Sequence, residues 1–335
     1  MTLSLIKATL RSAITPILLG LTSFAPAQAP VQAPAAAQNP QPLIATGFQG
    51  MFFITAVLTG TYASKTPGVI PDVRFEGETL AMKALTDGTS HMALMGRDLF
   101  PEEEAAFVAK WGYPPTRVAI AMDALVVLVN KNNPIKEIKI EQLDAAYSID
   151  RKQGWPKDVI TWGDLGIKQQ GWENRPIERM GRPADSGNFW LLTEALTQRG
   201  RPRLPIRGNL DTTTLTEELA ANQAGLAYGN MVEKFNSTKI VPLVPKGSKI
   251  PVEATAETVA SGEYPLCRFL YTYINKDPKK GMAPVVKGFL TFALSPMGQG
   301  IVKQCGQVPL QPDVHALNLL KVTDRFDADQ NALRN

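Results

Sequence analysis

The stretch Gly181-Arg-Pro-Ala-Asp-Ser-Gly-Asn-Phe-Trp190 runs directly into a helical pattern over residues 191–198. Ser186, Gly187 and Asn188 open that helix, and the first N–H groups of a helix have no partner within it. The free amides, the positive end of the helix dipole and the guanidinium of Arg182 all favour negative charge at one point. Gly187 lets the backbone come close, so a tetrahedral oxyanion fits this arrangement.

Two interpretations of this stretch remain open from spacing alone. Residues 177–180 are typical of a strand, which gives the order of strand, glycine turn and helix that anion sites use. In the other interpretation Ser186 merely caps the helix, and Asp185 beside it satisfies the same dipole.

Apolar segments alternate with helical patterns on the N-terminal side of this stretch. Strands are expected at 43–45, 69–75 and 91–95, and helices at 51–62, 79–86 and 101–111. That alternation predicts an α/β fold with a parallel sheet. Two long apolar segments, 117–130 and 266–274, are typical of strands that cross between lobes, so we expect two lobes joined by a hinge. Helices at 282–293 and 297–304 are expected to pack back on the first lobe.

Length and composition favour an ordinary folded protein of about two domains. The chain has 335 residues, of which 44% are hydrophobic and 20% are charged, without long acidic or basic blocks. No nucleic-acid partner is therefore expected.

The N-terminus has the pattern of an export signal. Lys7 and Arg11 precede an apolar run over residues 13–24, and Ala25-Pro26-Ala27 has the small-x-small form of a signal-peptidase site. The expected boundaries are a signal peptide at 1–27, an Ala/Pro-rich linker at 28–42, the first lobe at 43–127, the second lobe at 128–265, and the rest of the first lobe with a C-terminal tail at 266–335. The protein is therefore expected to be periplasmic or secreted.

Cys267 and Cys305 are the two cysteines of the chain. In an exported protein they could form a disulfide that joins the second crossing strand to the last helix, and two buried free thiols are the alternative.

Several stretches together resemble the periplasmic phosphate-binding proteins of ABC importers. In family order they are Met95-Gly-Arg-Asp98, Asp123-Ala-Leu-Val-Val-Leu-Val-Asn130, Thr161-Trp-Gly-Asp-Leu165, Arg182-x-x-x-Ser186-Gly187, Tyr264-Pro-Leu-Cys-Arg-Phe-Leu-Tyr-Thr-Tyr-Ile-Asn-Lys276 and Ser295-Pro-Met-Gly-Gln299. The resemblance covers residues 43 to about 312 and implies the two-lobed type II binding-protein fold. It also implies that the lobes close on an oxyanion, most simply inorganic phosphate, and deliver it to a membrane permease.

The resemblance implies the site residues one by one. Arg182, Ser186 and Gly187 match the family's arginine and Ser-Gly turn, and Asn188 stands in place of a threonine. In the first lobe the matching positions are Gln49, Gly50, Thr79, Arg97 and Asp98. The hydroxyl-rich loops of the family differ here, because Gly47-Phe48-Gln49-Gly50 has no serine, Glu78 replaces a serine, and Gly96 replaces a small hydroxyl residue.

Other functional classes fit the residues less well. Ser186 lacks the G-x-S-x-G elbow of the common α/β hydrolases, and His91 and His315 are the only histidine bases in the chain. No His/Cys cluster has the spacing of metal ligands, so no metal and no cofactor are expected. A monomer is expected. The serious rival is a module with the same fold that binds another oxyanion, or that senses or scavenges without a permease.

Overall fold

The computed structural model describes residues 40–184, 186–208, 212–231 and 236–323. The predicted signal peptide, residues 28–39 of the predicted linker, Asp185 and the last twelve positions of the chain, 324–335, lie outside the described residues. The predicted export and linker boundaries therefore stay predictions.

One mixed sheet organises the described residues. Its strands are ordered β2 (Val69–Arg74), β1 (Gln41–Gly47), β3 (Met92–Met95), β10 (Cys267–Ile274), β4 (Thr116–Asn130), β7 (Gly225–Asn230) and β6 (Glu178–Met180), and β8 (Thr238–Val241) also pairs with β4. A separate pair is formed by β5 (Ile138–Lys139) and β9 (Leu243–Val244).

The direction of the strands confirms part of the predicted sheet. β1 runs parallel to β2 and β3, and β6 runs parallel to β7, as the alternation of strands and helices predicts. β10 runs antiparallel to β3 and β4, so the sheet as a whole is mixed rather than parallel. The chain leaves along β4 and returns along β10, which reverses its direction.

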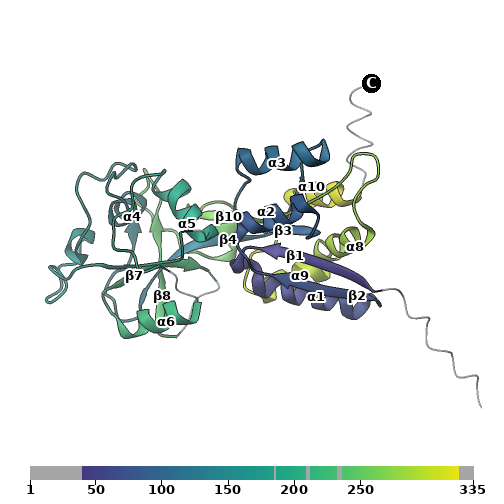
Figure 1. Ribbon diagram of the computed structural model, residues 1–335. Coiled ribbons are helices and arrows are strands. Elements are labelled where there is room, and N and C mark those ends of the chain that lie inside the picture. The colour runs from purple at the N-terminus through teal and green to yellow at the C-terminus, as the bar shows by residue number, and fades with distance from the viewer. Residues whose placement is uncertain (1–39, 185, 209–211, 232–235, 324–335) are drawn as a thin grey trace, which may run out of the picture. The chain divides into compact units, whose positions relative to one another are not determined.

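β4 belongs to both halves of the sheet. Residues 116–124 pair with β10, whereas residues 125–130 pair with β7 and β8. Every residue of β4 from Val118 to Asn130 is buried, which explains why this part of its sequence is apolar apart from Asp123 and Asn130. In Figure 1, β4 and β10 lie between the elements around β1–β3 and those around β7 and β8. We refer to β1–β3 with β10 as the first half and to β6–β8 as the second half.

Helices cover both halves of the sheet. They are α1 (Phe52–Lys65), α2 (Glu78–Asp87), α3 (Pro101–Trp111), α4 (Ile140–Tyr147), α5 (Gly187–Leu191), α6 (Thr212–Ala221), α7 (Ala256–Ala260), α8 (Pro284–Ala293), α9 (Pro296–Gln304) and α10 (Pro312–Thr323). α8 packs against β1, and α8 and α9 both pack against α1, which confirms the expected return of the last helices to the first half (Figure 1).

Short helical turns complete the fold. 3-10 turns occur at η1 (Gln49–Met51) and η2 (Trp162–Leu165), and α5 continues into a π-helical turn, η3 (Leu192–Leu196). The helix predicted over 191–198 therefore begins earlier, at Gly187. β8 and β9 are separated at Pro242, because proline has no N–H to donate to a ladder.

The region predicted as a C-terminal tail contains a helix. α10 begins at Pro312, and Asn318 and Val322 on this helix are buried. The Ala119 N–H on β4 donates a hydrogen bond of 2.8 Å to Asn318 Oδ1, which fixes α10 against the crossing strand. His315 therefore lies on a packed helix. His91 also has a structural partner, since its Nδ1 accepts a 3.1 Å hydrogen bond from the Ile44 N–H.

The disulfide prediction is wrong for this structure, because Cys267 and Cys305 are both free thiols. Cys267 lies on β10 opposite Ala124, and Cys305 follows the last residue of α9. Burial raises the pKa of both thiols, so the reactive thiolate form is disfavoured at each position.

No single helix among the described residues is long and apolar enough to cross a membrane. α8 and α9 pass such a test only as a pair, and they are bent by 65° at the break between them.

Candidate functional site

The first half of the sheet brings three chain segments to one edge. β1 ends at Gly47 and β3 ends at Met95, and the carboxyl ends of parallel strands meet at the same edge of a sheet. The Phe48 N–H, directly after β1, donates a 2.9 Å hydrogen bond to Leu94 O of β3. The Gly77 N–H donates to Gly47 O at 3.3 Å, which brings the first turn of α2 to the same place.

The second half of the sheet contributes the start of α5. β6 leads into Gly181, where an added Cβ would lie 2.1 Å from Tyr228 Cε1 on β7, so only glycine fits. Ser186 is the N-cap of α5. Its hydroxyl accepts a 3.2 Å hydrogen bond from the Phe189 N–H and donates one of 2.7 Å to Pro183 O. Ser186 therefore caps α5, which is compatible with both interpretations of this stretch, and Asp185 lies outside the described residues.

Gly187 is the point where the two halves meet. A Cβ on Gly187 would lie 2.9 and 3.0 Å from the two carboxylate oxygens of Glu78 and 3.1 Å from the ring of Phe48. Gly50 and Gly96 also lie against the Phe48 ring, at 2.4 and 3.1 Å from an added Cβ. Three glycines thus leave the room that the Phe48 ring and the Glu78 carboxylate occupy.

Glu78 opens α2 and points into this contact. Its Oε1 accepts a 2.5 Å hydrogen bond from the Gly96 N–H, and its Oε2 lies 3.6 Å from Arg97 Nε. Only 2% of Glu78 is exposed. Burial raises the pKa of Glu78 above its usual range, although the Gly96 amide and the guanidinium groups of Arg97 and Arg268 oppose that shift.

Arg97, which follows β3, is bound by a carboxylate of α3. Its Nη1 and Nη2 each donate a 2.8 Å hydrogen bond to Glu103, one to each carboxylate oxygen. This bidentate geometry is the strong form of an Arg–carboxylate pair. The guanidinium also lies 3.8 Å from the centre of the Phe100 ring, and that ring contacts Trp190 of α5 at 4.6 Å between centres.

Arg268 on β10 links the two halves through hydrogen bonds. Its Nη1 donates to Gly187 O at 2.8 Å, and its Nη2 donates to Asn188 Oδ1 and, at 3.1 Å, to Asn230 Oδ1 of β7. Nη2 also lies 3.3 Å from Asp123 Oδ2 on β4. Burial raises the pKa of Asp123, and the Arg268 guanidinium opposes that shift.

Comparison with known proteins identifies the family. Residues 33–297 match the model of the PBP superfamily domain. The phosphate-binding protein PstS of Pseudomonas aeruginosa is 35% identical over 253 residues, which are 76% of this chain and 78% of that protein. The chain belongs to the PstS family. A second relative, protein SphX of Synechococcus elongatus, is 24% identical over 328 residues, which are 97% of this chain and 92% of that protein.

Solved structures share the fold of this PstS-family chain. A protein from Clostridium perfringens, solved with bound phosphate, gives a TM-score of 0.65 at 21% identity and covers 81% of this chain and 100% of that one. An ABC-type phosphate transport receptor from Vibrio cholerae gives a TM-score of 0.61 at 18% identity, and the match covers 79% of this chain and 98% of that one. The predicted resemblance and the two-lobed type II fold are thereby confirmed.

The structure of this PstS-family chain brings together four of the nine predicted site residues. Gly187, Asn188 and Arg97 belong to the cluster around Glu78 and Arg268, and Gly50 lies against the Phe48 ring. Ser186 lies one residue before this cluster as the N-cap. Arg182 is half-buried in the same loop, and its carbonyl accepts a 3.2 Å hydrogen bond from the Tyr228 hydroxyl.

Three predicted site residues lie outside the cluster. Gln49, Thr79 and Asp98 are exposed. Asp98 forms an ion pair with Arg117, whose side chain is partly exposed, so in this structure Asp98 does not contact the cluster. Thr79 follows Glu78 on α2, and successive helical residues point in directions about 100° apart, so the two side chains cannot share one face.

Several residues of the cluster were not among the nine predicted site residues, including Phe48, Glu78, Asp123, Asn230 and Arg268. Asp123 and Arg268 did carry a signal, because each is a charge inside a predicted apolar crossing strand. Such charges are rarely buried unless they are paired, so opposite charges in two strands that cross together indicate an ion pair.

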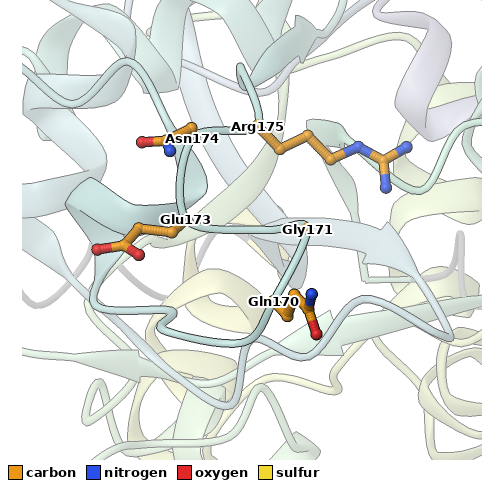
Figure 2. A pocket seen from close by; sticks show the side chains of 5 residues that line it. All are labelled: Gln170, Gly171, Glu173, Asn174 and Arg175. Atoms are coloured by element: carbon orange, nitrogen blue, oxygen red, sulfur yellow. The ribbon is translucent and has the colours of Figure 1, made fainter.

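Two surface cavities lie away from the cluster. One of about 560 Å³ lies along the loop of residues 170–175, where Figure 2 shows Arg175 and Glu173 extending in opposite directions. The other, of about 360 Å³, is lined by His91, Trp111 and Tyr113 among others. Neither cavity is lined by a predicted site residue. Among the described residues no group of three or more His, Cys, Asp or Glu side chains could hold a metal ion.

Proposed function

We propose that the protein binds inorganic phosphate and delivers it to an ABC importer. The observation that carries this proposal is the start of α5, in a chain of the PstS family: Ser186 caps the helix, and Gly187 lies against the Glu78 carboxylate. That carboxylate accepts the Gly96 N–H and lies 3.6 Å from Arg97 Nε. A helix start and a second backbone amide at one point favour an oxyanion. Arg182 supplies a guanidinium from the loop that precedes α5.

Like its PstS relatives, the protein is a binding protein and not an enzyme. The proposed working form is an exported monomer whose mature chain begins near Gln28. This proposal rests on the export pattern of the first residues. The proposed first lobe comprises residues 43–127 and 266–335, and the proposed second lobe comprises residues 128–265. The division is placed there because β4 passes from one set of strand pairs to the other near residue 125.

A second candidate is a module of the same fold that binds another oxyanion, or that senses or scavenges without a permease. It is favoured by Glu78 and Phe48, which fill the space beside Gly187 where the family has hydroxyl side chains. Both candidates need an anion at the same helix start, and they differ in which anion binds.

We predict that calorimetric titration of the purified mature protein detects phosphate binding and no sulfate binding near neutral pH. A carboxylate beside the anion can accept a hydrogen bond from protonated phosphate but meets only lone pairs on sulfate. Such a like-charge contact discriminates by several kcal/mol. Glu78 is placed to do this, whereas Asp98 is exposed.

The control for this prediction is Asp98→Asn, which removes the exposed carboxylate that follows β3. It should leave the preference for phosphate unchanged. Arsenate and molybdate are titrated alongside, and tight binding of sulfate or molybdate by the unmutated protein would favour the second candidate over phosphate.

A further inference from the structure

The space between the start of α5 and the strand ends of the first half is filled by the protein's own side chains. The Glu78 oxygens lie 2.9 and 3.0 Å from the position of a Cβ on Gly187, and the Phe48 ring lies 3.1 Å from it. A phosphate that binds at the start of α5 and also contacts the Gly96 amide must therefore take the place of the Glu78 carboxylate.

Glu78 already uses a donor that an anion would need. Its Oε1 accepts the Gly96 N–H at 2.5 Å. Glu78 Oε2 and Arg97 Nε are buried and make no hydrogen bond to a described residue, although they lie 3.6 Å apart. Buried polar atoms without hydrogen bonds are costly, so these two atoms indicate an arrangement that a ligand oxygen would complete.

The neighbouring charges do not favour an additional anion while Glu78 is ionised. Arg97 is paired with Glu103, and Arg268 is paired with Asp123. Together with Glu78 this makes three carboxylates against two guanidinium groups around Glu78 itself, to which Arg182 adds a third guanidinium from the loop before α5. An incoming phosphate therefore meets the charge of Glu78 as well as its bulk.

On the basis of the proposed function, we propose that Glu78 is a tethered competitor of phosphate, whose carboxylate occupies the anion position until phosphate displaces it. The side chain remains close to the bound anion after displacement, because Glu78 is the first residue of α2. Phosphate, which carries a proton near neutral pH, then shares a hydrogen bond with it, whereas sulfate is repelled.

The competition depends on the ionisation of Glu78. The charged groups that act on it are Arg97 after β3, Arg268 on β10 and Glu103 on α3, and from α5 the contact is the backbone of Gly187. Burial raises the pKa of Glu78, so the carboxyl takes up a proton at higher pH than an exposed glutamate does. Protonation weakens its hold on the Gly96 amide and removes its repulsion of the anion.

The test replaces Glu78 with serine, the residue type found at this position in the family, and measures phosphate binding by calorimetry at about pH 5 and about pH 8. At the higher pH, Glu78→Ser should bind phosphate at least about tenfold more tightly than the parent. At the lower pH, this difference in affinity should be smaller. Titrations in buffers of different ionisation enthalpy should show that the parent takes up more protons on binding than Glu78→Ser does.

Glu76→Ser is the matched control, since Glu76 is an exposed glutamate two residues away. It should follow the parent at both pH values, and the comparison cancels the ionisation of phosphate itself. Glu78→Gln, which keeps the size of the side chain, serves if the serine variant fails to fold.

Each outcome of the test is decisive. Equal or weaker phosphate binding by folded Glu78→Ser and Glu78→Gln at the higher pH would overturn the inference and leave the proposed function intact. If neither the parent nor any variant binds phosphate at either pH, the proposed function fails, and the inference fails with it.

Discussion

Replacing Arg268 with alanine is expected to lower the free energy of unfolding by about 3–5 kcal/mol. The reason is that Arg268 is the charged partner of Asp123, of which only 1% is exposed, and its removal leaves that carboxylate buried without its ion pair. The same change removes the hydrogen bonds to Gly187, Asn188 and Asn230, which connect the two halves. Urea denaturation followed by circular dichroism measures the loss.

Arg117→Ala is the matched control for this prediction. Arg117 lies on β4 and forms an ion pair with Asp98, but its side chain is 45% exposed and that of Asp98 is 70% exposed. Exposed pairs contribute about 1 kcal/mol or less. A loss of stability in Arg268→Ala no greater than in Arg117→Ala would mean that the buried pair does not hold the two crossing strands together.

Arg182→Ala is expected to weaken phosphate binding by about 2–5 kcal/mol, which is the usual loss when one partner of a desolvated charge pair is truncated. Ser186→Ala should cost less, because it removes at most one hydrogen bond to a charged group, worth about 1.5–3 kcal/mol. Calorimetry with phosphate measures both variants against the parent at one pH.

The control for Arg182 is Arg207→Ala, which removes an exposed arginine of the same half that is paired with Glu218. It should bind phosphate as the parent does, which separates a local contact from a general loss of positive charge. If Arg182→Ala also binds phosphate as tightly as the parent, the anion site is not at the start of α5.

The fold could be predicted largely from apolar patterning. The long apolar run at 117–130 predicted a strand that crosses between the lobes, and the structure places β4 in both halves of the sheet. The alternation before it predicted the parallel order of β1, β2 and β3. The antiparallel position of β10 between β3 and β4 could not be predicted from the sequence in the same way. Strand direction depends on how distant segments pair rather than on local periodicity.

The site was predicted less completely, because side-chain direction is set by the tertiary structure. Arg97 and Asp98 are adjacent, yet Arg97 pairs with Glu103, whose side chain is 10% exposed, while Asp98 pairs with the more exposed Arg117. Glu78 and Asp98 are both carboxylates in the loops of the predicted first-lobe site, and only the fold shows that Glu78 is buried and Asp98 exposed. The hydrogen bonds of Arg268 join residues that are far apart in the chain, and no local pattern specifies such partners.

The anion site can be located directly in a crystal of the protein soaked in arsenate, a tetrahedral oxyanion like phosphate, with diffraction measured at the arsenic absorption edge. We expect one strong anomalous peak between the N–H groups that open α5 at Gly187 and the Gly96 N–H, with the Glu78 carboxylate moved off that amide. A bound arsenate elsewhere on the molecule, with Glu78 still accepting the Gly96 hydrogen bond, would contradict this expectation.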